Sequence, residues 1–297
     1  MRWNLWIAFA VLCVLSGTSW AIPREMSDGL PLLEQQGVLF GVVGLIALLF
    51  AGRGVWSRSR GLYAGLAGAA VGFFGVPIVV AEYAHGSVPA ISRSALFALV
   101  PVVVVMSVAS GESAGREERG ARLFLMPALA GLGGLLLLLP LAFSSSARGW
   151  MMLAVVCAAV VLVGLASVWL YRLLRGFALA DAIAVVGLAN AVFLLVWSAV
   201  REEIVWRGNG LASVMSIASL TDVAEVLLIV GLLREMPPIR FAARYLVIPL
   251  LTVLESFVVM RPDWTVRMGF GTALLAAGGG MLLFLQAGEE GTVLSLR

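Results

Sequence analysis

The chain has 297 residues, of which 61% are hydrophobic and only 12% are charged. This composition excludes a water-soluble domain and indicates an integral membrane protein. The net charge is +3, and the 20 basic residues, all arginines, are scattered among short connections, which argues against nucleic-acid binding.

Ten apolar stretches follow one another along the chain. Each is close to the roughly 20 residues that a helix needs to cross a bilayer. The connections between them are short, so no soluble domain is inserted. The sequence therefore predicts an all-α integral membrane protein with ten transmembrane helices. The predicted spans cover residues 3–22, 31–51, 61–83, 87–109, 121–142, 149–171, 177–199, 211–233, 240–260 and 267–287.

The first stretch can be read in two ways. The segment "VLCVLSGTSWAIP" has small residues around Trp20, as a cleavable secretory signal has. However, Trp3 and Trp20 bracket this stretch just as Trp150 and Trp169 bracket the sixth span, and a group of small residues precedes the second Trp in each case. A signal peptide would have no such partner, so we expect residues 1–21 to be retained as the first helix.

Two further pairs of motifs suggest an internal repeat. The fourth and ninth spans contain a proline after an apolar triplet, in "LFALVP" and "RYLVIP". The fifth and tenth spans contain glycine clusters, in "ALAGLGGLLLL" and "LLAAGGGMLLF". We therefore interpret residues 1–145 and 146–297 as two five-helix repeats in one membrane domain. Because five is an odd number of crossings, the second repeat has inverted topology, as in many secondary transporters.

The arginines predict the orientation. Cytoplasmic loops near membrane ends are enriched in positive charge. With the N-terminus inside, thirteen arginines fall on the cytoplasmic side and seven on the opposite side. We expect a multi-pass protein of the inner (cytoplasmic) membrane with both termini in the cytoplasm.

The order of these motifs resembles the drug/metabolite transporter superfamily, specifically its ten-helix EamA-type members. The resemblance rests on "ALFALVPVVVVMSVASGE", on "YLVIPLLTVLES", on the glycine-rich fifth and tenth helices, and on the first helix with its small-polar-Trp end. It implies a metabolite transporter. The family commonly has Gly-Glu after both proline-bearing helices; here Gly111-Glu112 fits, but Met260-Arg261 occupies the second position.

The eighth span carries the clearest candidate site. Asp222 and Glu225 in "SIASLTDVAEVLLIV" are three residues apart on one helix face, and Ser219 lies one turn earlier. Charge inside a membrane is costly and marks function. We expect the pair to bind a proton or another cation, and the alternative is a structural ion pair with Arg93 or Arg244.

Other polar residues within the spans are candidates for substrate binding. Arg93 and Arg244 lie about one turn inside their helices, and the favoured interpretation is that their side chains snorkel to the membrane interface. If either side chain points inward instead, it could bind a carboxylate or phosphate. Glu255 is equally ambiguous, whereas Glu34 and Glu82 are expected at the interface. Asn190 either binds substrate or bonds across a helix contact. The remaining candidates, at helix ends with small polar neighbours, are Thr18, Ser19, Trp20 and Trp169.

Two prolines and one glycine pattern are also informative. Pro101 and Pro249 each remove a backbone hydrogen bond near mid-membrane and are candidate hinges. In the third span, Gly61, Gly65, Gly68, Gly72 and Gly75 form a stripe that predicts close packing against another helix.

The function predicted from these features is secondary transport, with export of a small polar or amphipathic metabolite by alternating access as the expected mode and proton coupling as a further option. No cofactor or metal is expected, since Cys13, Cys157 and the lone His85 stand at no ligand spacing. The alternatives are a lipid-modifying enzyme, for which the sequence offers no cluster of catalytic residues, and a non-transporting scaffold. The lipid bilayer is the expected environment, and a homodimer is compatible with the apolar surface.

Overall fold

The computed structural model describes residues 2–19, 30–51, 59–110, 123–139, 141–201, 217–259 and 265–285. Within these ranges the regular structure is helical and contains no strand, so the all-α prediction is confirmed. Trp20 lies outside the described residues, as do the dipeptides Gly111-Glu112 and Met260-Arg261.

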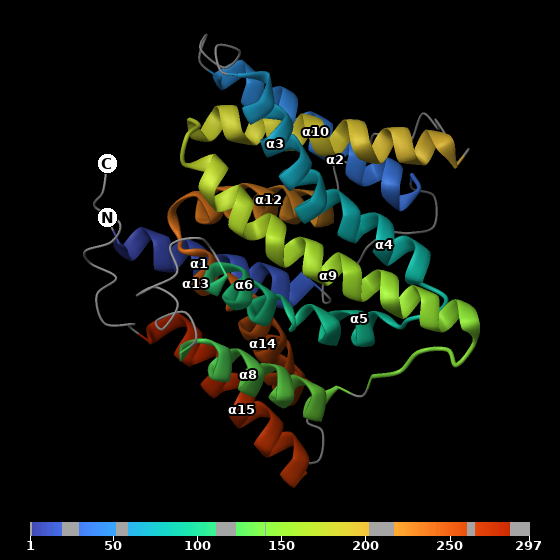
Figure 1. The fold of residues 1–297 in the computed structure, drawn as a ribbon, viewed down its shortest axis with the longest axis vertical. Coiled ribbons are helices and arrows are strands. Elements are labelled where there is room, and N and C mark those ends of the chain that lie inside the picture. The colour runs from blue at the N-terminus through green and yellow to red at the C-terminus, as the bar shows by residue number, and fades with distance from the viewer. Residues whose placement is uncertain are drawn as a thin grey trace. The chain divides into compact units, whose positions relative to one another are not determined.

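Each of the ten predicted spans contains helix within its described residues (Figure 1). In that part of the chain, seven spans contain one helix and three are built from more than one segment. The elements in chain order are α1 (Arg2–Thr18), α2 (Leu32–Phe50), α3 (Arg60–Ala70), η3 (Val71–Gly75), α4 (Val76–Ala84), α5 (Ala90–Phe97), α6 (Val100–Ala109), α8 (Leu125–Leu138), α9 (Ala147–Leu174), α10 (Leu179–Val200), α12 (Ile217–Glu235), α13 (Pro238–Ala242), α14 (Arg244–Val259) and α15 (Val266–Phe284).

Seven of the described helical segments are long and apolar enough to cross a membrane, which makes the chain a multi-pass membrane protein. These segments are 32–50, 60–84, 90–109, 147–174, 179–200, 238–259 and 266–284. The seven do not include α1 and α8, which are shorter apolar helices. They also do not include α12, which carries four charged residues, Asp222, Glu225, Arg234 and Glu235.

Three of these segments are interrupted. Residues 60–84 contain the π-helical turn η3, a local irregularity that occurs often at functional sites. In residues 90–109 the helix breaks at Ala98 and Leu99, directly before Pro101. In residues 238–259 it breaks at Ala243, between α13 and α14.

The chain forms two compact units. Unit 1 contains Met1–His85 and Trp169–Met236, and unit 2 contains Gly86–Val168 and Pro237–Arg297. The boundary at Val168 falls inside α9, so this helix contributes to both units. Each unit therefore combines segments from the first and the second half of the chain.

In unit 1, the central contact is between α2 and α10 (Figure 1). A Cβ atom at Gly187 would lie only 2.7 Å from the Gly44 Cα, and a Cβ atom at Gly37 would lie 2.9 Å from the Leu195 side chain. Residue numbers rise along α2 as they fall along α10, so the two helices are antiparallel. The glycines let the two backbones touch, which strengthens van der Waals packing inside a membrane.

Unit 2 contains a second glycine-mediated pair, formed by α8 and α15 (Figure 1). A Cβ atom at Gly134 would lie 2.6 Å from the Gly271 carbonyl oxygen, and a Cβ atom at Gly278 would lie 2.5 Å from the Gly131 amide nitrogen. This pair is also antiparallel. The glycine clusters of the fifth and tenth predicted spans therefore pack against each other.

The glycine stripe of the third span packs only in part, which corrects the sequence prediction. A Cβ atom at Gly75 would lie 2.7 Å from the Phe193 ring, so this glycine does sit in a tight contact. By contrast, Gly61 and Gly68 have no atom within 4 Å of the position that a Cβ atom would take, and Gly65 makes only an ordinary contact with Leu173. The turn η3 begins three residues after Gly68 and contains Gly72 and Gly75, so the two glycines of the stripe that are buried both lie in the π-helical turn.

Candidate functional site

A cluster of polar side chains connects the first turns of α2 and α12 in unit 1. The Gln36 Nε2 donates a hydrogen bond to Asp222 Oδ2 at 2.9 Å. The Gln35 Nε2 lies 3.5 Å from Ser219 Oγ, at the limit of a hydrogen bond. Ser219 is only 2% exposed. The sequence predicts that Ser219 and Asp222 share one helix face. In the structure, this face lies against Gln35 and Gln36 of α2.

Glu34, which we expected at the membrane interface, belongs to the same part of α2 and is 1% exposed, so the rest of the protein covers it. α2 begins at Leu32, which places Glu34 in the first helical turn. There the positive end of the helix dipole favours a carboxylate. Sequence reasoning missed this residue; the run of three polar residues in "LLEQQG" was the signal that could have identified it.

Two further candidates from α1 and one from α12 lie in unit 1. The Thr18 Oγ1 donates to the Val14 carbonyl at 2.8 Å, and the Ser19 Oγ donates to the Ser16 carbonyl at 2.9 Å. Both hydroxyl groups therefore donate to their own helix and retain only acceptor capacity. α1 packs against α12. On α12, Glu225 is half-buried, one turn beyond Asp222.

Asn190 on α10 is fully buried beside η3. Its Nδ2 donates to the Val186 carbonyl at 2.8 Å, within its own helix. Its Oδ1 accepts no hydrogen bond from the described residues and lies against Gly75, where a Cβ atom would come within 2.9 Å. The amide thus meets the backbone of the π-helical turn, rather than a polar side chain of a neighbouring helix.

The candidate Trp169 and two other tryptophans near helix ends differ in their surroundings. Trp169 is 60% exposed, and Trp150, near the other end of α9, is 58% exposed. Exposed Trp residues near both ends of a spanning helix are typical of anchors at the two membrane interfaces. Trp197 is 39% exposed and donates from Nε1 to the Tyr83 hydroxyl oxygen at 3.1 Å.

In unit 2, Arg244 is buried and surrounded by aromatic rings. It is 6% exposed, so the favoured prediction that it snorkels to the interface is wrong. Its Nη2 donates to the Tyr245 hydroxyl oxygen at 2.8 Å. The guanidinium carbon lies 4.4 Å from the centre of the Phe241 ring and 4.6 Å from that of Tyr245, in cation–π geometry. The break at Ala243 produces this arrangement, because it places Arg244 at the start of α14 beside Phe241 of α13.

Arg93 and Glu255 lie on different parts of unit 2. Arg93 is half-buried and donates from Nη1 to the Val88 carbonyl at 3.2 Å. One turn further along α5, the Phe97 ring stacks on Tyr245 at a centroid distance of 6.1 Å, which connects α5 to the surroundings of Arg244. Glu255 is half-buried on α14, but it lies eleven residues after Arg244, which corresponds to about 16 Å along a helix.

The two candidate hinge prolines occupy different positions. Pro101 lies in the first turn of α6, immediately after the break in its span. Pro249 lies inside α14, which continues through it to Val259. The break in this second span lies at Ala243, six residues before the proline.

Comparison with known proteins identifies a fold but no family. No protein-family model matches the chain, and no curated protein matches it in sequence. A solved crystal structure of a protein matches with a TM-score of 0.71 and 19% identity, and the match covers 97% of this chain and 100% of that one. At this level of identity, the likeness shows that the two chains share a fold over nearly their whole length.

Proposed function

We propose that the protein is a secondary transporter that moves a small polar or amphipathic metabolite across the membrane by alternating access. The observation that carries the proposal is the cluster of Gln35, Gln36, Ser219 and Asp222 inside a unit built from membrane-spanning helices. Acidic groups within a membrane are costly and are found chiefly on ion or substrate pathways. A chain selected only for packing would be expected to place apolar residues there.

The helix pairing supports the inverted five-helix repeat. In that repeat, the second span is equivalent to the seventh and the fifth to the tenth, and equivalent spans run in opposite directions. The two glycine-mediated pairs, α2 with α10 and α8 with α15, join these equivalent spans, and both pairs are antiparallel. Inverted repeats allow one structure to open alternately to either side of the membrane.

The charges suggest how a substrate would be held. The carboxylate of Asp222, which accepts a hydrogen bond from Gln36, suits a proton or the cationic group of a metabolite. The interrupted spans at Ala98 and Ala243 are the proposed points of bending. The resemblance to EamA-type transporters supports the same function, with export across the inner membrane and both termini in the cytoplasm.

The test compares metabolites in the medium and cytosol of cells that express the intact protein, Asp222→Asn or Glu235→Gln at matched membrane levels. Glu235 is a matched control because it is an exposed acidic residue at the far end of α12. We expect a metabolite that the intact protein and Glu235→Gln export and that Asp222→Asn retains. Equal export by all three would remove Asp222 from the mechanism, and profiles identical to those of empty-vector cells would favour a non-transporting scaffold.

A further inference from the structure

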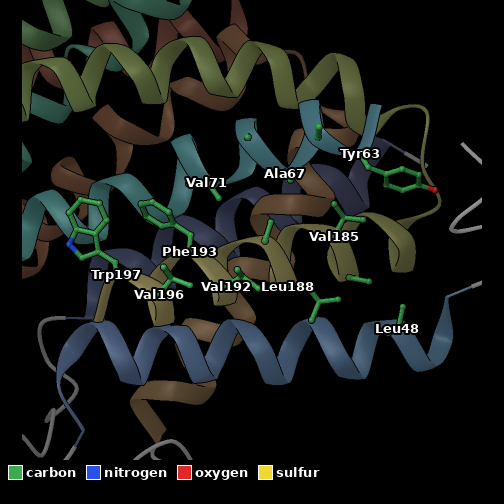
Figure 2. A pocket seen from close by; sticks show the side chains of 14 residues that line it. Leu48, Tyr63, Ala67, Val71, Val185, Leu188, Val192, Phe193, Val196 and Trp197 are labelled. Atoms are coloured by element: carbon green, nitrogen blue, oxygen red, sulfur yellow. The ribbon is translucent and has the colours of Figure 1, made fainter. Parts of the chain in front are cut away.

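An apolar groove of about 870 Å³ runs along the surface of unit 1, between α3 and α10 (Figure 2). Tyr63 lies at one end and Trp197 at the other, with Val185, Leu188 and Val192 between them. The volume lies within the range of roughly 300–1,000 Å³ that is typical of small-molecule sites. Val192 is 63% exposed, so the groove is open along the side of α10.

The groove exists because α3 presents small residues to it. Ala64, Ala67 and Gly68 form its floor on this helix. No atom lies within 4 Å of the position of a Cβ atom at Gly68. The space therefore results from missing side chains, rather than from helices held apart by large ones.

The dimensions of the groove suit one acyl chain. The lining residues on α10 run from Ala184 to Trp197, thirteen residues further along, which is about 20 Å of helix. One leaflet of the hydrocarbon core is about 15 Å thick, half of the full core. A lipid tail that starts at the interface and reaches the middle of the bilayer would fit into this length, and the apolar lining offers such a tail van der Waals contact on several sides.

At the Trp197 end of the groove, an arginine lies beside two aromatic rings. The Trp197 indole donates to the Tyr83 hydroxyl oxygen, and the two rings meet edge to face at 6.3 Å. The guanidinium carbon of Arg201, an exposed residue one turn beyond Trp197, lies 4.4 Å from the centre of the Tyr83 ring. Trp and Tyr prefer the headgroup level of a membrane. The same end therefore combines interfacial aromatic rings with a cation.

From this combination we infer that the groove binds one acyl chain of an anionic phospholipid, with the phosphate of the headgroup beside Arg201. The site is separate from the polar cluster of α2 and α12. The inference does not depend on the proposed transport function, because it concerns the outer surface of unit 1 and a ligand that is part of the bilayer.

Native mass spectrometry of the full-length, delipidated protein in detergent tests this site. The probes are 1-palmitoyl-2-oleoyl phosphatidylglycerol and the phosphatidylcholine with the same chains. We expect one tightly bound phosphatidylglycerol. Gly68→Leu should abolish this adduct, because the new side chain fills the groove. Gly61→Leu is the matched control: it lies on the same helix, has open space around its Cβ position, and does not line the groove.

The charge is tested separately. Arg201→Gln should reduce the preference for phosphatidylglycerol by about fivefold, the effect of one arginine near an anionic surface. Arg175→Gln is its control, since Arg175 is also exposed and also lies over a tyrosine ring, that of Tyr171 at 4.2 Å. Equal lipid binding by Gly68→Leu and Gly61→Leu would overturn the groove as the site. Suppose instead that the intact protein shows no lipid adduct but forms a dimer, and that Gly68→Leu abolishes this dimer. That result would assign the groove to a second copy of the chain.

Discussion

The contact between α8 and α15 predicts that two glycines only two residues apart will respond oppositely to the same substitution. A Cβ atom at Gly278 would lie 2.5 Å from the Gly131 amide nitrogen and 2.6 Å from the Pro127 carbonyl oxygen. Both are backbone atoms, which cannot rotate away. A Cβ atom at Gly280 would have no atom within 4 Å. Gly278→Ala must therefore push the two helices apart, whereas Gly280→Ala leaves the contact unchanged.

The expected magnitudes follow from the two situations. Overpacking of a close contact costs about 1–3 kcal/mol, which should appear as a lower unfolding temperature for Gly278→Ala. Replacing Gly with Ala in an open helical position stabilises the helix by up to about 1 kcal/mol, so Gly280→Ala should unfold at the same or a higher temperature than the intact protein. Thermal unfolding of the purified protein in detergent, followed by far-UV circular dichroism, measures both.

The partner helix provides an independent repetition of this experiment. On α8, a Cβ atom at Gly134 would meet the backbone of α15, whereas one at Gly133 would have no atom within 4 Å. Gly134→Ala should destabilise the protein and Gly133→Ala should not. If Gly278→Ala and Gly134→Ala were both as stable as their controls, the described contact between α8 and α15 would be refuted.

Three further substitutions test other parts of the structure. Gly44→Ala should lower the unfolding temperature, because its Cβ atom would lie 2.7 Å from the Leu188 amide nitrogen on α10. The control Gly231→Ala, which has open space around its Cβ position, should not lower it. Equal unfolding temperatures for the two variants would contradict the contact between α2 and α10. Arg244→Lys should destabilise the protein by about 1–2 kcal/mol in the same assay, since the planar guanidinium that faces two aromatic rings is lost. An unchanged unfolding temperature would argue against the cation–π contacts. Pro249→Ala should stabilise α14, because the alanine restores a backbone hydrogen bond. The variant should transport the exported metabolite more slowly but bind it equally well. An unchanged transport rate would exclude Pro249 as a hinge.

Much of the fold could be predicted from the sequence because membrane spans have a simple physical requirement. A helix must be long and apolar to cross a bilayer, so α2, α9 and α10 lie close to their predicted limits. α12 was also predicted, although its acidic residues reduce its apolar character. The π-helical turn η3 could not be predicted, because its residues, "VGFFG", have the same apolar character as the α-helical turns around them.

The candidate site was less predictable because burial depends on partners from distant parts of the chain. The spacing of Ser219 and Asp222 on one helix was correct, but nothing local indicated that α2 would supply Gln36 as the donor to Asp222. Arg244 and Glu34 were both expected near the interface because they lie close to helix ends. The structure buries both, since a helix end can be covered by neighbouring helices as well as by solvent.

The central claim, alternating access to the polar cluster of unit 1, can be tested directly without knowing the substrate. Both native cysteines are first replaced, by Cys13→Ala and Cys157→Ala, and a single cysteine is introduced by Ser219→Cys. A small, membrane-impermeant thiol reagent is then applied to right-side-out vesicles and, separately, to inside-out vesicles. Ala182→Cys is the control, because Ala182 is also buried in unit 1 but lies at the opposite end of α10 from the residues that pack beside the polar cluster. We predict that position 219 is labelled from both sides of the membrane and position 182 from neither. Protection of position 219 from one or both sides would contradict alternating access at this site.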